Sequence, residues 1–192
     1  MRRGLLGLAL LAALAGGCAY DVRREAESPA PGRLARLRRV AVAPFRYEND
    51  WTGYFRDIYR RAGAAPPPER KAERIEATFL LEDALAGRGY ELVEWPGGEP
   101  APGGEGAAAL KDLPALLRGA GAEAALLARG GSRCESLDLC TAWVELRLVE
   151  AAGGRVVWRA EGSAATLFAQ GDEMRAAVQG ALSALPGPPE GR

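Results

Sequence analysis

The chain has 192 residues, of which 25 are basic, 25 are acidic and none is histidine, so its formal net charge at pH 7 is zero. This balance argues against nucleic-acid binding, which needs a net basic surface to displace counterions from phosphates. The absence of histidine excludes Ser-His-Asp and Cys-His catalytic pairs and histidine-based zinc sites within this chain. No spacing of carboxylates or lysines indicates another catalytic or calcium site. We therefore predict that the protein is not an enzyme and that it uses no metal or cofactor.

The amino-terminal segment is built like a bacterial export signal. Two arginines precede an apolar run of Leu, Ala and Gly, and small residues lead to Cys18. The run is too short to span a bilayer. The segment resembles a lipobox, in which the cysteine is lipidated and becomes the first residue of the mature protein. We expect residues 1–17 to be a signal peptide and Cys18 to carry lipid; the alternatives are an ordinary secretory signal cut near Ala19 and a short membrane anchor.

Residues 18–37 are expected to form a flexible tether, because they are charged, contain proline and glycine and lack regular apolar spacing. About 18 flexible residues span roughly 25 Å, which would hold the domain clear of the lipid surface. Arg33, Arg36, Arg38 and Arg39 either contact anionic headgroups or flank the first strand as solvated charges.

The residue after Cys18 bears on the membrane to which the lipid is attached. Ala19 is not the aspartate that resembles an inner-membrane retention signal. We therefore expect the protein to be anchored in the outer membrane and to face the periplasm.

Residues 38–185 predict one small α/β (α+β) domain with a mixed sheet. The continuous apolar run at 40–45 indicates a central strand covered on both faces, and the broad apolar stripe at 70–87 indicates a helix. The elements expected next are a strand at 90–95, a helix at 107–118, strands at 122–128, 143–149 and 156–160, and a helix at 174–185. The order is β-α-β-α-β-β-β-α. Residues 186–192 are expected to be a disordered tail.

Two of these elements have distinctive patterns. Val144, Leu146 and Leu148 alternate with polar or exposed types, which is typical of a half-exposed antiparallel strand, and a glycine turn joins this strand to the next one as a hairpin. Pro114 interrupts the 107–118 helix pattern, and a helix that began at Asp112 would place the proline in its first turn, where a missing N–H costs little.

Aromatic residues are dense between the first strand and the 70–87 helix. Trp51, Tyr54 and Phe55 are candidates for a partner-binding surface, because aromatic rings supply large contact areas at low entropic cost. The alternative is a helical turn around residues 54–59 that folds against the domain as a satellite of the core.

Cys134 and Cys140 flank a short connection between the third and fourth strands. Export would place them in an oxidising compartment, and paired strand ends can bring two β-carbons within bonding distance. A redox-active pair normally has Cys-x-x-Cys spacing beside a helix start, which is absent here. We predict that these two cysteines form a structural disulfide.

Several segments occur in an order found in a known group of proteins, namely residues 39–45, 89–93, 121–127 and 144–158. They resemble bacterial envelope lipoproteins that include curli-secretion lipoproteins, lipoprotein activators of penicillin-binding proteins and TolB amino-terminal domains. Glu123 and Glu150 stand where those families often have aspartate. The resemblance covers about residues 38–185 and implies a small α/β domain, membrane anchoring and an accessory role. It transfers no family binding residue to this chain.

Together these features predict a lipid-anchored, non-enzymatic periplasmic module that binds or helps to assemble another envelope protein. We infer no small-molecule substrate. One alternative is a subunit of an envelope secretion or pore complex, as the curli-type relatives suggest. The other is a cell-wall hydrolase that works without histidine, which no positive feature of the sequence supports.

Overall fold

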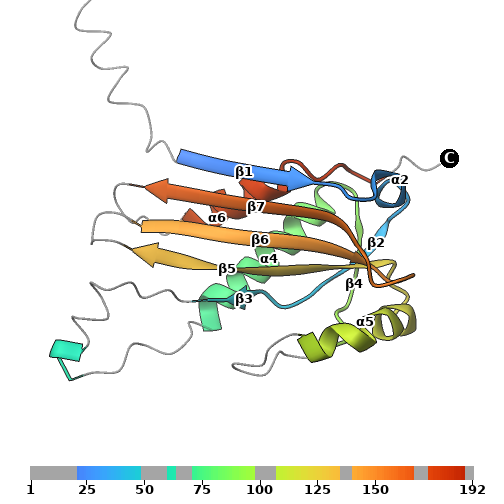
Figure 1. Cartoon of the computed structure of the whole chain (residues 1–192), viewed down its shortest axis with the longest axis horizontal. Helices are drawn as coiled ribbons and strands as arrows, with labels where there is room; N and C mark the ends of the chain where they lie inside the picture. The colour runs from blue at the N-terminus through green and yellow to red at the C-terminus, as the bar shows by residue number, and fades with distance from the viewer. Residues whose placement is uncertain are drawn as a thin grey trace, which may run out of the picture.

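The chain folds around one mixed seven-stranded sheet (Figure 1). The computed structural model describes residues 21–48, 60–63, 71–97, 107–134, 140–166 and 173–188. In chain order the elements are β1 (Asp21–Glu27), α2 (Pro31–Leu34), β2 (Arg39–Val42), β3 (Arg46–Tyr47), α4 (Lys71–Ala86), β4 (Glu91–Val93), α5 (Ala107–Gly119), β5 (Ala124–Cys134), β6 (Cys140–Glu150), β7 (Val156–Thr166) and α6 (Glu173–Leu182). The strand order is β1-β7-β6-β5-β2-β4, and β3 pairs with β5. The predicted single α+β domain with a mixed sheet is confirmed.

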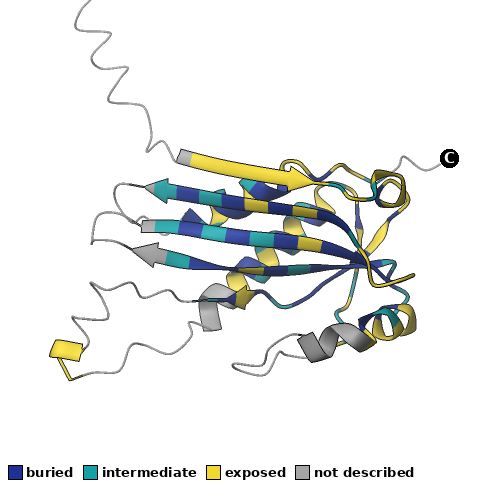
Figure 2. Ribbon diagram, in the orientation of Figure 1, coloured by how far each residue is buried: buried dark blue, intermediate teal, exposed yellow. Residues whose placement is uncertain are grey.

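Three long antiparallel strands, β5, β6 and β7, form the centre of the sheet. Val144, Leu146 and Leu148 on β6 are fully buried, whereas the residues between them are partly or fully exposed (Figure 2). This confirms the half-exposed strand that the alternating sequence predicts. The strands are longer than expected, because their ends carry alanine, glycine and polar residues that lack a strong apolar pattern.

The short strand β2 lies between β5 and β4 and is parallel to both. Val40 and Val42 belong to the main core on one face, and Ala41 belongs to a smaller apolar cluster on the other face. The predicted central strand with two covered faces is therefore confirmed. The helices α4 and α6 lie behind the sheet in Figure 1 and cover the main core, while α5 contributes Leu113 and Leu117 to the smaller cluster.

Contact between α6 and the sheet depends on Gly162 of β7. A Cβ atom at this position would lie 2.4 Å from the backbone oxygen of Ala177 and 2.9 Å from the Cβ atom of Ala181. The absence of a side chain lets the helix backbone approach the strand closely. Small residues on both elements thus set the distance between this helix and the sheet.

The flexible tether expected for residues 18–37 is not what the structure shows from residue 21 onward. Residues 21–27 form β1, which pairs with β7 along seven consecutive residues, and Leu34 and Leu37 are buried in the main core. The sequence pattern missed β1 because its side chains are exposed (Figure 2), so the strand is held by backbone pairing and lacks an apolar face. The segment up to residue 37 is therefore part of the folded domain.

Two further differences concern a helix and the chain after residue 185. The helix α5 runs from Ala107, so Pro114 lies inside it and a start at Asp112 is wrong. The residues that follow α6 pack against the domain, since the Tyr90 hydroxyl donates a hydrogen bond of 2.8 Å to the carbonyl oxygen of Pro186. The start of the predicted disordered tail is thus ordered by a buried tyrosine; residues 189–192 lie outside the described residues.

Candidate binding surfaces

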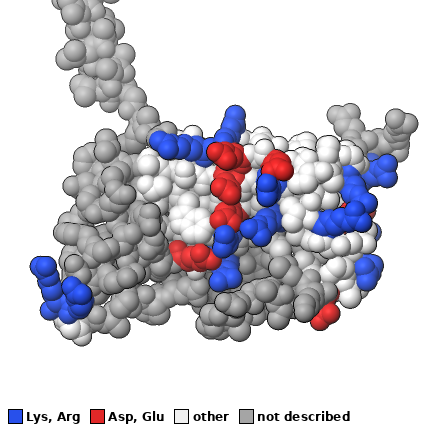
Figure 3. Space-filling model, viewed as in Figure 1, with Lys and Arg blue, Asp and Glu red and all other residues white. Residues whose placement is uncertain are grey.

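The first open surface is the face of the sheet opposite α4 and α6. Charged side chains cross it in rows (Figure 3). In the strand register Arg129 lies opposite Glu145, Glu145 opposite Glu161, and Glu161 opposite Glu25. Three glutamates on neighbouring strands therefore lie in one row across the sheet, with an arginine at the end of the row. Like charges directly opposite each other destabilise a sheet unless other groups neutralise them.

Arginines on the same face pair with Glu145, one of these three glutamates, and with the nearby Glu27. Arg129 donates two hydrogen bonds, of 2.8 and 2.7 Å, to the two carboxylate oxygens of Glu145, and this contact raises the pKa of Arg129. Arg147 lies 3.6 Å from the same carboxylate, and Arg159 pairs with Glu27. A shallow depression of about 310 Å³ lies among these side chains. On the open face Glu145 and Glu27 are therefore paired with arginines, whereas Glu25 and Glu161 form no ion pair with any described residue.

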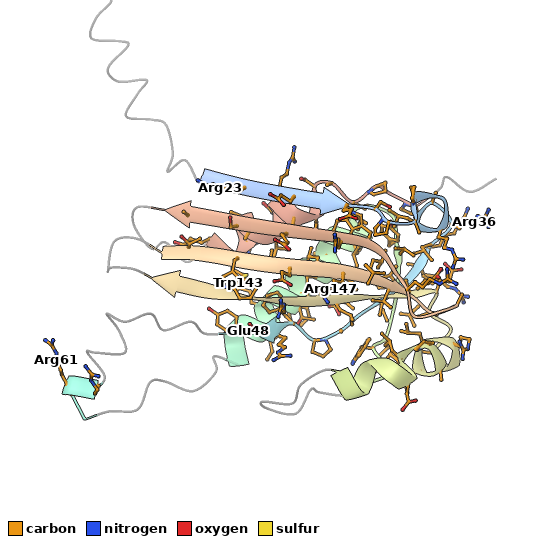
Figure 4. All side chains as sticks on the ribbon, in the orientation of Figure 1. Arg23, Arg36, Glu48, Arg61, Trp143 and Arg147 are labelled. Atoms are coloured by element: carbon orange, nitrogen blue, oxygen red, sulfur yellow. The ribbon has the colours of Figure 1, made fainter. Side chains whose placement is uncertain are left out.

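An aromatic side chain borders the charged network. Trp143 lies directly opposite Gly131 in the register of β5 and β6, and its Nε1 atom is 3.5 Å from where a Cβ atom of Gly131 would lie. That Cβ atom would also clash with the backbone oxygen of Glu48, at 1.7 Å. Figure 4 shows Trp143 and Glu48 at neighbouring positions on this part of the sheet. Gly131 thus leaves room for the chain that follows β3 to cross the strand.

A second surface lies at the end of the sheet where β2 begins. The Glu123 carboxylate accepts hydrogen bonds from the backbone N–H groups of Arg38 at 2.7 Å and Arg39 at 3.1 Å. The buried Glu150 carboxylate pairs with the guanidinium group of Arg33. These two glutamates therefore hold the start of β2 and the helix α2 in place.

Arginines gather around these two glutamates, and we call this group the arginine end. It consists of Arg33, Arg36, Arg38, Arg39, Arg118 and Arg155. Hydrogen bonds place three of its members beside these glutamates: the Arg39 carbonyl accepts from the Glu123 N–H, the Arg155 carbonyl accepts from the Glu150 N–H, and the Arg118 side chain donates to the Ala151 carbonyl. Figure 4 shows Arg36 at the same end of the sheet. Figure 3 shows a group of basic side chains at this end of the molecule.

A third surface is the outer side of α4. Phe79 is 60% exposed and Ile75 is 42% exposed, which is unusual for such large apolar side chains. They line a depression of about 460 Å³ together with Arg175, which lies 3.7 Å from the Glu76 carboxylate. Among the described residues, no helix is both long and apolar enough to cross a membrane, and no group of three potential ligands could hold a metal ion.

Most of the residues singled out from the sequence cannot be placed on these surfaces. Cys18, Trp51, Tyr54 and Phe55 are outside the described residues. Cys134 and Cys140 are directly opposite each other where β5 ends and β6 begins. The sequence analysis named four of the arginines at the arginine end, but only the tertiary structure brings Arg118 of α5 and Arg155 of the β6–β7 turn to them.

Comparison with known proteins supports the fold. No family model and no curated protein matches the chain. Among solved structures, the PelC dodecamer from Paraburkholderia phytofirmans is similar with a TM-score of 0.52 and 20% identity, over 88% of this chain and 99% of that chain. The LpoB C-terminal domain from Escherichia coli has a TM-score of 0.44 and 15% identity, over 67% of this chain and 83% of that one. Lipoprotein GNA1162 from Neisseria meningitidis has a TM-score of 0.40 and 16% identity, over 76% and 96% respectively.

Proposed function

We propose that the protein is a lipid-anchored envelope lipoprotein that acts as a non-enzymatic binding or assembly module on the periplasmic side of the outer membrane. The observation that carries this proposal is the position of β1, which begins at Asp21 and is paired with β7 from its first residue. Three steps of the chain, at most about 11 Å, separate the Cα atoms of Cys18 and Asp21. A lipid on Cys18 would therefore hold the sheet itself close to the bilayer.

Three features of the chain support the non-enzymatic part of the proposal. The chain contains no histidine, its open sheet face is covered by charged side chains of which several are in ion pairs, and its exposed surfaces are broad and shallow. Such surfaces suit contact with a macromolecule better than the enclosure of a small substrate. The domain would then work by presenting one of these surfaces to another envelope protein at a fixed height above the membrane.

The anchoring part is tested by expressing the full chain in a bacterial host and measuring the mass of the mature protein. We expect an amino terminus at Cys18 that carries a lipid, and recovery in the outer-membrane fraction. Cys18→Ser should prevent lipidation and release the protein from the membrane, whereas Cys134→Ser, the same substitution at another cysteine, should leave it in the membrane. A mature chain that begins after Cys18, or one with an unmodified Cys18 thiol, would refute the proposal.

A second candidate function is that of a subunit in an oligomeric envelope complex. It is favoured by the alignment of this chain with nearly the whole of the PelC chain, which was crystallised as a dodecamer. The exposed Phe79 on α4 offers an apolar contact for a neighbouring subunit. Light scattering during size-exclusion chromatography of the detergent-extracted protein distinguishes the two: a monomer argues against this candidate, and a ring-sized species that Phe79→Ser dissociates would support it.

A further inference from the structure

The arginines of this protein fall into two groups according to their partners. On the open sheet face Arg129, Arg147 and Arg159 each lie within ion-pair distance of a glutamate. At the arginine end, Arg36 and Arg39 are exposed and form no ion pair with any residue that the structure describes. The same holds for Arg38 and Arg155.

The carboxylates near the arginine end do not neutralise these side chains. Glu123 accepts hydrogen bonds from two backbone N–H groups, and Glu150 is buried against Arg33. Glu91 lies beside Arg39 in the parallel register of β2 and β4, but forms no ion pair with it in the described structure. Among the residues that the structure describes, four guanidinium groups thus have no carboxylate partner, and an external anion could supply one.

The arginine end lies far from the proposed attachment point. The start of β1 pairs with Ala165 and its last residue, Glu27, pairs with Arg159, so the strand extends about 20 Å along the sheet. Figure 4 shows Arg23 near the start of β1 and Arg36 at the opposite end of the sheet. If Cys18 carries the lipid and β1 points away from the bilayer, the arginine end lies on the side of the domain that is remote from that membrane.

We propose that the arginine end is a docking surface for a carboxylate-rich segment of another envelope protein. A guanidinium group can bind a carboxylate through two parallel hydrogen bonds, which an isolated ammonium group cannot do. A cluster of exposed positive charges also accelerates association with an acidic partner. The position of the surface favours a protein over the headgroups of the anchoring membrane. The inference rests on the proposed envelope function for the identity of the partner, but binding itself can be measured whether or not Cys18 is lipidated.

The test measures binding of poly-L-glutamate to the detergent-solubilised full chain, with vesicles of phosphatidylglycerol as a second probe. We expect R36E/R39E to weaken poly-L-glutamate binding by at least about tenfold. R24E/R61E makes the same change in net charge at residues outside the arginine end, and should bind within about threefold of the unmodified chain. The neutral variant R36Q/R39Q introduces no repulsion, so its affinity for poly-L-glutamate should lie between the affinities of R36E/R39E and R24E/R61E. Circular dichroism checks that each variant is folded.

Three outcomes would overturn the proposal. Equal weakening by R36E/R39E and R24E/R61E would mean that only net charge matters. Binding to phosphatidylglycerol vesicles but not to poly-L-glutamate, lost in R36E/R39E, would identify a lipid surface as the partner. If R36E/R39E, but not R24E/R61E, sediments differently from the unmodified chain when no probe is present, the partner of the arginine end is a second copy of the chain. Failure of lipidation at Cys18 would refute the anchoring proposal and leave these binding results unchanged.

Discussion

Glu150 at the end of β6 pairs with Arg33 of α2, a residue 117 positions earlier in the chain. The Glu150 side chain is only 6% exposed, whereas the Arg33 side chain is 46% exposed. The ion pair therefore ties the segment after β1 to the turn between β6 and β7. A region with the composition of a flexible linker is in this way joined to the most regular part of the sheet.

Removal of Arg33 should destabilise the domain. In Arg33→Ala the buried Glu150 carboxylate loses its charged partner, and we expect the free energy of unfolding to fall by about 1–2 kcal/mol, a value limited by the solvent exposure of the arginine. Denaturation by urea measures the change. Arg36→Ala removes a nearby arginine that has no described partner and should change stability by less than about 0.5 kcal/mol. Equal effects of the two substitutions would show that the ion pair contributes nothing.

Gly162 should not tolerate a side chain. The methyl group of Gly162→Ala would meet the backbone of α6, and we expect a loss of about 2–3 kcal/mol because the helix must move away from the sheet. Gly119→Ala is the matched control, since a Cβ atom there has nothing within 4 Å, and it should be neutral or slightly stabilising. Thermal unfolding of both variants tests the packing of α6 on β7, which a small loss in Gly162→Ala would contradict.

The Tyr90 hydroxyl should make stability depend on alkaline pH. Burial raises the pKa of Tyr90 above its usual value of 10.0, with a smaller opposing effect from Arg88. The folded chain then keeps a proton that the unfolded chain releases, so the free energy of unfolding falls as the pH rises above about 10. Tyr90→Phe removes the hydrogen bond to Pro186, so its free energy of unfolding at pH 8 should be lower by about 1 kcal/mol. Its free energy of unfolding should also fall less steeply above pH 10. Urea denaturation from pH 8 to 11 measures both effects; an unchanged decline would contradict the assignment to Tyr90.

Cys134 and Cys140 should be oxidised in the exported protein. Residues directly opposite each other in antiparallel strands have Cα atoms about 4.5–5.5 Å apart, within the range that a disulfide spans. We expect thiol titration without reductant to find neither cysteine free, and Cys134→Ser to expose one thiol and to lower stability by about 2 kcal/mol. Quantitative labelling of both cysteines in the unmodified exported chain would show that the disulfide does not form.

The candidate surfaces could be predicted only in part. Arg36, Arg38 and Arg39 are adjacent in the sequence and were recognised as a basic group, but Arg155 comes from a turn more than 100 residues later. The ladder of glutamates across β1, β7 and β6 was not predicted, because it depends on strand order and register. Conversely, the aromatic residues most prominent in the sequence lie outside the described part of the chain.

Elements with a distinctive apolar pattern could be located from the sequence alone, namely β6 by its alternating Val144 and Leu146 and the central strand β2 by its continuous apolar run. Local periodicity records which face of an element is buried, so one chain segment suffices to find it. The tertiary structure was needed to show that the charged residues 21–27 form β1, that Cys134 lies opposite Cys140 in the strand register, and that Arg36 and Arg39 form no ion pair with any described residue. These features depend on backbone pairing and on distances between segments far apart in the chain, which no local pattern of side chains encodes.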